Sequence, residues 1–200
     1  MALALRHWKR AEYDRLIDLG VFVDEPLELI GGQRVVAEPK GPYHVTGVAL
    51  TADALRATLP AGWHVRTEAP IALDDDSEPE PDIAAVPGSY DDYLHAHPAR
   101  PALVVEVSDL QLDFDRTHKA SLYARGGIAD YWIVNLIDRV LEIYREPVRD
   151  TSAPYGWRYG SVRTLPPTAT ATPLAIPSAS VAVADLLPTG SRTASRRSRT

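Results

Sequence analysis

The chain of 200 residues contains no cysteine. This absence excludes disulfide bonds, thiolate zinc sites and cysteine nucleophiles. Any bound metal ion must use oxygen or imidazole ligands, which suits Mg²⁺ or Mn²⁺. The sequence also lacks a run of roughly eighteen apolar residues, so we expect no transmembrane helix and no membrane partner. In residues 1–10 the basic residues follow the apolar ones, which is the wrong order for a signal peptide and predicts a cytoplasmic protein.

The charge is unevenly distributed along the chain. The net charge is −6, but the last ten residues carry four arginines and no acid, which leaves −10 for the rest. An acidic body argues against a broad phosphate-binding face. It does not exclude a local cleft in which a metal ion offsets carboxylate charge. We expect residues 1–190 to form one domain and residues 191–200 to be a disordered basic tail.

The hydrophobic pattern alternates between helical and strand periods. Helices are expected over 1–19, 43–59 and 112–125, a glycine-turned hairpin over 27–36, strands over 63–68, 69–73, 81–86, 102–107, 131–134 and 139–144, a hairpin or single strand over 155–165, and a last short element over 180–187. The acidic run 74–78 is expected to be a solvated turn. This order predicts an α/β fold with a mixed central sheet flanked by helices.

Glu106 interrupts the most apolar predicted strand, residues 102–107. Burying its charge is costly unless something pairs with it. The ordinary explanation is a strand-end carboxylate that faces solvent or an arginine. The alternative is a bound metal ion, for which Asp82, at the start of another strand, is the natural second ligand. Two carboxylates completed by water and phosphate oxygens are a common Mg²⁺ arrangement.

Lys119 lies on the predicted helix that follows the Glu106 strand. At helical spacing it shares a face with Asp115, Leu122 and Tyr123. Because Leu122 and Tyr123 should pack toward the sheet, Asp115 and Lys119 are expected to turn the same way. The spacing leaves two readings open: an ammonium directed at the carboxylate cluster, or an ordinary surface pair between Asp115 and Lys119.

Three further residues are supporting candidates. Glu28 and Glu68 are acids within apolar segments, and each is expected at a sheet edge, with membership of the cluster as the alternative. His44 begins a predicted helix, where a histidine is more often structural but can bind phosphate near a metal site. The other histidines lack paired ligand spacing, which argues against a histidine zinc site.

Several of these segments together resemble the Uma family of restriction endonucleases. The segments are Glu80-Pro81-Asp82-Ile83, then Leu103-Val104-Val105-Glu106-Val107-Ser108, then 115–123 with Asp115, Lys119 and Tyr123, and then Tyr131-Trp132-Ile133-Val134. The hairpin with Glu28 and the helix with His44 fit the same pattern. The resemblance extends over roughly residues 10–187, and it is the ordered set of motifs that is specific.

The resemblance implies the PD-(D/E)xK nuclease fold, a restriction-endonuclease-like mixed central sheet flanked by helices. It implies Asp82 and Glu106 as ligands of Mg²⁺ or Mn²⁺, and a homodimer. The lysine that usually stands two residues after the glutamate is Ser108 here, and the family's lysine on the next helix corresponds to Lys119. The chain departs from the family pattern in the run 108–110 and at Asn135, both beside the site.

These observations predict a metal-dependent endonuclease that hydrolyses phosphodiester bonds, with DNA as the expected nucleic-acid partner. Asp82 and Glu106 would hold the metal, Lys119 would position or activate water, and Asp115 would orient Lys119. Glu28, His44, Glu68 and Tyr123 are supporting candidates. One rival is a catalytically weak or inactive family member that acts as a nucleic-acid-binding or protein-interaction module. A weaker one is a hydrolase of another phosphoester.

Overall fold

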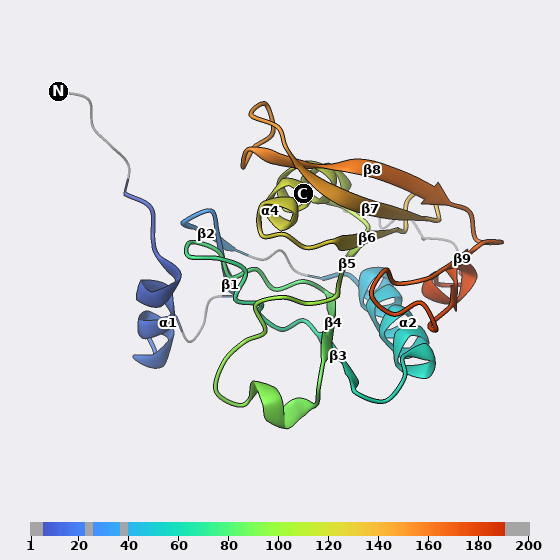
Figure 1. The fold of residues 1–200 in the computed structure, drawn as a ribbon, viewed down its shortest axis with the longest axis horizontal. Coiled ribbons are helices and arrows are strands. Elements are labelled where there is room, and N and C mark those ends of the chain that lie inside the picture. Colours follow the sequence, from blue (N-terminus) through green and yellow to red (C-terminus); the bar gives the residue numbers. More distant parts are fainter. Residues whose placement is uncertain (1–5, 23–25, 37–39, 191–200) are drawn as a thin grey trace, which may run out of the picture.

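A six-stranded mixed sheet forms the centre of the molecule in the computed structural model, which describes residues 6–22, 26–36 and 40–190 (Figure 1). In spatial order the strands are β3 (Trp63–Thr67), β4 (Ile83–Pro87), β5 (Leu103–Ser108), β6 (Asp130–Asn135), β7 (Val140–Arg149) and β8 (Trp157–Leu165). Only β5 and β6 pair in parallel; the other neighbours are antiparallel. The predicted fold class, a mixed sheet flanked by helices, is confirmed.

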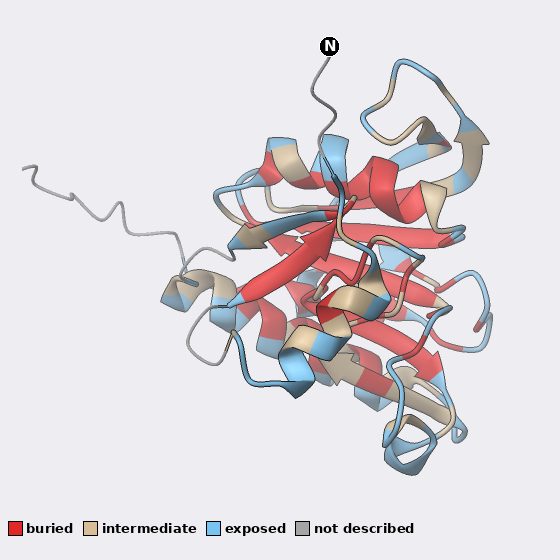
Figure 2. Cartoon of the chain, turned by 90° about the vertical axis from the view of Figure 1, so that its left-hand side faces the viewer, coloured by how far each residue is buried: buried red, intermediate tan, exposed pale blue. Residues whose placement is uncertain are grey.

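The inner strands alternate apolar side chains between two buried faces, as a sheet covered on both sides requires. On β5, Leu103, Val105 and Val107 join one core cluster, whereas Val104 joins the other. Figure 2 shows these central strands as buried between more exposed outer segments. Alternation therefore places Glu106 on the same face as Val104.

Each face of the sheet is covered by a different helix. The helix α2 (Pro42–Thr58) contributes Val48, Ala52 and Leu55 to the first cluster. The second cluster is covered by one continuous helical segment, α3 (Leu112–Phe114), η2 (Asp115–Lys119) and α4 (Ala120–Arg125). Lys119 and Tyr123 therefore approach the sheet from the face on which Glu106 lies.

The remaining elements pack around this three-layer body. They are α1 (Arg10–Asp18), the hairpin β1 (Leu27–Ile30) with β2 (Gln33–Val36), the short pair β9 (Thr170–Ala171) with β10 (Val181–Ala182), and the 3-10 turns η1 (Tyr90–Tyr93) and η3 (Val183–Leu186). The hairpin turn uses Gly31 and Gly32 at φ of +57° and +76°, as the sequence predicted. Within the described ranges, every helix is too short or too polar to cross a bilayer.

Three sequence predictions differ from the structure. The first helix begins at Arg10 rather than at the N-terminus, and residues 1–5 lie outside the described part. Residues 69–73 form no strand, although Ile71 and Leu73 are buried. The acidic run 74–78 is no fully solvated turn, because Ser77 and Glu78 are buried. The predicted disordered tail, 191–200, also lies outside the described residues.

Candidate active site

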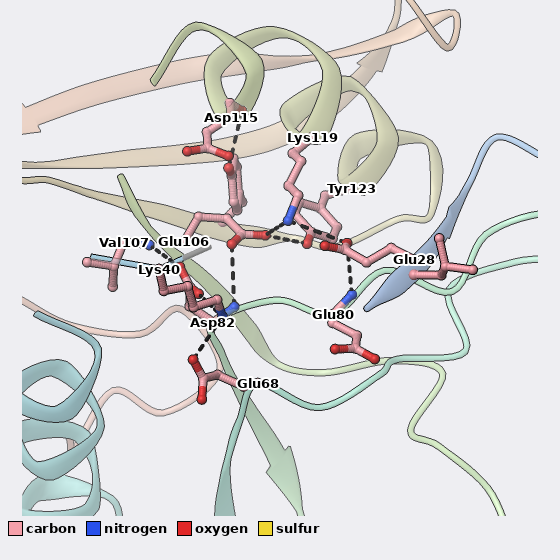
Figure 3. Close-up of polar contacts among 12 residues, drawn as sticks. Glu28, Lys40, Glu68, Glu80, Asp82, Glu106, Val107, Asp115, Lys119 and Tyr123 are labelled. Carbon is pink, nitrogen blue, oxygen red and sulfur yellow. Dashed lines mark hydrogen bonds and ion pairs between the residues drawn. The ribbon is translucent and has the colours of Figure 1, made fainter. Parts of the chain in front are cut away.

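The two carboxylates singled out in the sequence lie side by side (Figure 3). Asp82 directly precedes β4, and Glu106 lies on β5, where Ile83 pairs with Val105. The main-chain N–H of Asp82 donates to Glu106 Oε2 at 3.4 Å. The two acids are 24 residues apart in the sequence, and the pairing of β4 with β5 brings them together.

Asp82 is held as an anion. Its Oδ2 accepts a hydrogen bond from Val107 N at 2.8 Å. Its Oδ1 lies 3.2 Å from both Lys40 Nζ and His44 Nε2. Burial alone would raise the pKa of Asp82, but His44, Lys40 and the Val107 amide outweigh it and lower the pKa to about 2. The carboxylate is therefore ionised at neutral pH.

Glu106 has the opposite electrostatic environment. Its Oε1 accepts hydrogen bonds from Lys119 Nζ at 2.9 Å and from Tyr123 Oη at 2.7 Å. Burial raises its pKa to about 8, with the negative charge of Asp82 adding to the rise and Lys119 opposing it. Paired carboxylates whose pKa values are driven apart are typical of sites that carry out acid–base or metal chemistry.

Lys119 is a buried cation, not a surface residue. Its Nζ contacts Glu106 and lies 3.6 Å from Glu28 Oε2. Burial alone would lower the pKa of Lys119, but Glu106, Glu28 and Asp115 outweigh it and raise the pKa. The alternative of a surface pair between Asp115 and Lys119 is wrong, because both residues are buried.

Asp115 does not contact Lys119 in the way the helical face predicted. Residues Asp115–Lys119 form a π-helical turn, in which the N–H of Ala120 donates to the carbonyl of Asp115. This wider turn breaks the four-residue spacing on which the prediction depended. Figure 3 shows the Asp115 carboxylate pointing away from Lys119. Burial raises the pKa of Asp115 to about 6, against the opposing charge of Lys119.

The supporting candidates all lie at the cluster. Glu28 Oε2 accepts from Glu80 N at 3.1 Å, which directs the β1 carboxylate toward Lys119. Glu68 follows β3 with a left-handed φ of +48°, rare for a non-glycine residue and common at functional sites. Its N–H donates to the carbonyl of Asp82 at 3.0 Å, which fixes the segment beside the site.

One set of side chains has the geometry of a metal site. Single ligand atoms of His44, Glu68 and Asp82 all lie within 4.8 Å of one another. His44 Nε2 is buried and has no aligned hydrogen-bond partner among the described residues, although Asp82 Oδ1 is near. An imidazole nitrogen close to two carboxylates is a donor set that fits a divalent cation, and imidazole with oxygen ligands suits Mn²⁺ as well as Mg²⁺.

Sequence reasoning missed Lys40, whose Nζ donates to Glu68 Oε1 at 2.8 Å and to Asp82 Oδ1 at 3.2 Å. No pattern marks it, since it stands alone before the first turn of α2 and reaches the site only through the path of the chain. Ser108, at the position of the usual motif lysine, is buried, and its hydroxyl opposes the rise in the pKa of the neighbouring Asp115 carboxyl group.

Comparisons with known proteins identify the family and the fold. Residues 10–184 match the Uma2 family, described as "Putative restriction endonuclease". A crystal structure described as a putative nuclease belonging to DUF820, from Anabaena variabilis, superimposes with a TM-score of 0.58 at 14% identity. The superposition covers 80% of this chain and 88% of that one. No curated protein matches the chain. The chain therefore belongs to the Uma2 family of restriction-endonuclease-like proteins.

Proposed function

We propose that this protein is a metal-dependent endonuclease that hydrolyses phosphodiester bonds in DNA. The observation that carries the proposal is the convergence of three ionisable groups into one buried cluster: Asp82 just before β4, Glu106 on β5 and Lys119 on the helical segment. A carboxylate pair with an adjacent ammonium suits the stabilisation of charge that develops on a phosphodiester. The homodimer remains a prediction from the resemblance.

The proposed ion is Mg²⁺ or Mn²⁺, held by Asp82 and Glu106 with His44 and Glu68 as additional ligands. Asp82 connects Glu106 with the additional ligands, because its main-chain N–H contacts Glu106 and its Oδ1 contacts His44. When bound, such an ion would act as a Lewis acid toward a phosphate oxygen and would lower the pKa of a coordinated water. The ionised state of Asp82 supports its role as the principal ligand.

Lys119 is proposed to act as a fixed positive charge. Its raised pKa makes it a poor proton acceptor, so charge stabilisation and water positioning are favoured over proton abstraction. Tyr123 and Glu28 are proposed to hold Lys119 and Glu106 in place, since each contacts one of them directly. Asp115 is proposed to act on Lys119 through its charge, because it makes no direct pair with it.

The test is cleavage of plasmid DNA with Mg²⁺ or Mn²⁺ by wild type, Asp82→Asn and Asp53→Asn. Asp53 is the matched control, an exposed acid on α2 that pairs only with neighbouring Arg56 among the described residues. We expect Asp53→Asn to cleave like wild type and Asp82→Asn to lose cleavage. Equal activity of Asp82→Asn and wild type would exclude Asp82 as the centre of the reaction.

A second candidate function is a non-catalytic, nucleic-acid-binding or protein-interaction module. The observation that favours it is Ser108, which stands where the usual motif has a lysine. Calorimetry with Mn²⁺ separates the two candidates. Loss of Mn²⁺ binding in Glu106→Gln or Asp82→Asn supports the endonuclease, whereas a wild type that binds DNA but no Mn²⁺ supports the module.

A further inference from the structure

Lys40 places a protein cation where the proposed metal ligands converge. It stands two residues before α2, and its Nζ lies 2.8 Å from Glu68 Oε1 and 3.2 Å from Asp82 Oδ1. Both of these residues belong to the same candidate ligand set as His44. A Mg²⁺ ion binds carboxylate oxygens at about 2 Å, so an ammonium in contact with both oxygens occupies the space that the ion needs.

The two cations also repel each other in this site. A divalent ion and an ammonium together carry three positive charges. Glu68 and Asp82 carry only two negative charges, so they cannot neutralise both cations. Electrostatic repulsion is strong where solvent is partly excluded, and Asp82 is almost fully buried. Binding of a metal ion at these oxygens therefore requires Lys40 to move.

Lys40 is free to move, unlike the other lysine at the site. Its side chain is 35% exposed, whereas that of Lys119 is 9% exposed and is held by Glu106 and Glu28. A lysine ammonium on its flexible stem exchanges partners readily, and a phosphate oxygen is one of its common partners.

We propose that Lys40 is a displaceable counter-cation: it holds Glu68 and Asp82 together without metal, and it moves to the substrate phosphate when the ion binds. This inference rests on the proposed function, because it needs a metal at Asp82 and a phosphodiester substrate. It makes Lys40 a substrate-positioning residue whose availability depends on metal occupancy. Only a protein with the ion in place would then present the free ammonium to DNA.

The test exploits the fact that the sequence has only three lysines, Lys9, Lys40 and Lys119. Acetylation of the full chain with an amine-reactive ester is followed residue by residue by mass spectrometry, with and without saturating Mn²⁺. We expect Lys40 to react several-fold faster with Mn²⁺, while exposed Lys9 stays constant and buried Lys119 stays slow. Adding phosphorothioate DNA to the Mn²⁺-loaded protein should then slow Lys40 again.

Calorimetry of Lys40→Gln provides the second measurement, with Lys9→Gln as the matched control. Removing a partly exposed ammonium from two carboxylates should tighten Mn²⁺ binding by about fivefold, and Lys9→Gln should leave it unchanged. If both variants and wild type bind Mn²⁺ equally and Lys40 labelling does not respond, the inference fails while the proposed function stands. If no form binds Mn²⁺, the proposed function fails and the inference with it.

Discussion

Replacement of Lys119 by methionine tests how the buried charges support one another. Methionine preserves the apolar stem but leaves Glu106 and Glu28 without their cation, at 2.9 and 3.6 Å. Removing one partner of a buried pair costs about 3 to 5 kcal/mol of unfolding free energy. We expect the lower end, about 3 kcal/mol, because Glu106, whose pKa burial raises to about 8, can take up a proton and lose its charge.

The double variant Glu106→Gln/Lys119→Met removes both charges and should recover part of that loss. The coupling free energy between the two sites, measured by urea unfolding at neutral pH, is expected at about 2 kcal/mol. The fluorescence of fully buried Trp132 reports the transition. Both variants should fail to cleave DNA. Additive unfolding free energies would contradict a direct, buried Lys119–Glu106 pair, and a stable Lys119→Met enzyme that still cleaves would contradict its proposed role.

Three further predictions concern residues outside the reacting groups. Asp130→Asn should lower the unfolding free energy by about 3 kcal/mol, because Asp130 is fully buried and pairs with Arg145 at 2.8 Å. Urea unfolding measures this loss, and the folded variant should still cleave DNA. Burial, with nearby acidic charge, raises the pKa of Glu78 from 4.5 to about 7 in the folded state. Because the folded state then binds a proton that the unfolded state has lost, the unfolding free energy of wild type should fall as pH rises from 4.5 to about 7. Glu78→Gln should abolish this fall of roughly 2 kcal/mol, and a pH series of unfolding curves that is identical for both proteins would refute it. Gly47→Ala should lower the thermal midpoint, because a Cβ there would lie 2.8 Å from Val107 Cγ1 and would push α2 from the sheet; an unchanged midpoint would show that the contact relaxes freely.

The sequence predicted most of the fold because its strong periodic segments coincide with buried elements. The hairpin at Gly31 and Gly32, the helix α2 and the strand with Glu106 were all placed within a few residues. The failures have local causes. Residues 69–73 carry a strand-like apolar pattern, but Ile71 N donates to the carbonyl of Pro79 instead of joining a ladder. In the run 74–78, Arg125 supplies a partner for the acids from a distant helix.

The candidate site was predictable in part. Glu106 was recognisable as a charge within an apolar strand. Asp82 was proposed from its place at a strand start and Lys119 from its helical face, and the resemblance then implied the same residues. The π-helical turn over Asp115–Lys119 could not be foreseen, because nothing in five polar residues distinguishes it from α-helix. Lys40 was missed since its contacts with Glu68 and Asp82 span 28 and 42 residues and depend on tertiary packing alone.

The most direct test of the central claim, a metal-dependent site centred on Asp82, is anomalous diffraction from crystals soaked with Mn²⁺. We predict one strong peak at about 2 to 2.5 Å from Asp82 Oδ1, with His44, Glu68 or Glu106 completing the ligand set. The same peak should vanish in Asp82→Asn and persist in Asp53→Asn. A Mn²⁺ ion bound elsewhere, with Asp82 still paired to Lys40 and His44, would contradict the account.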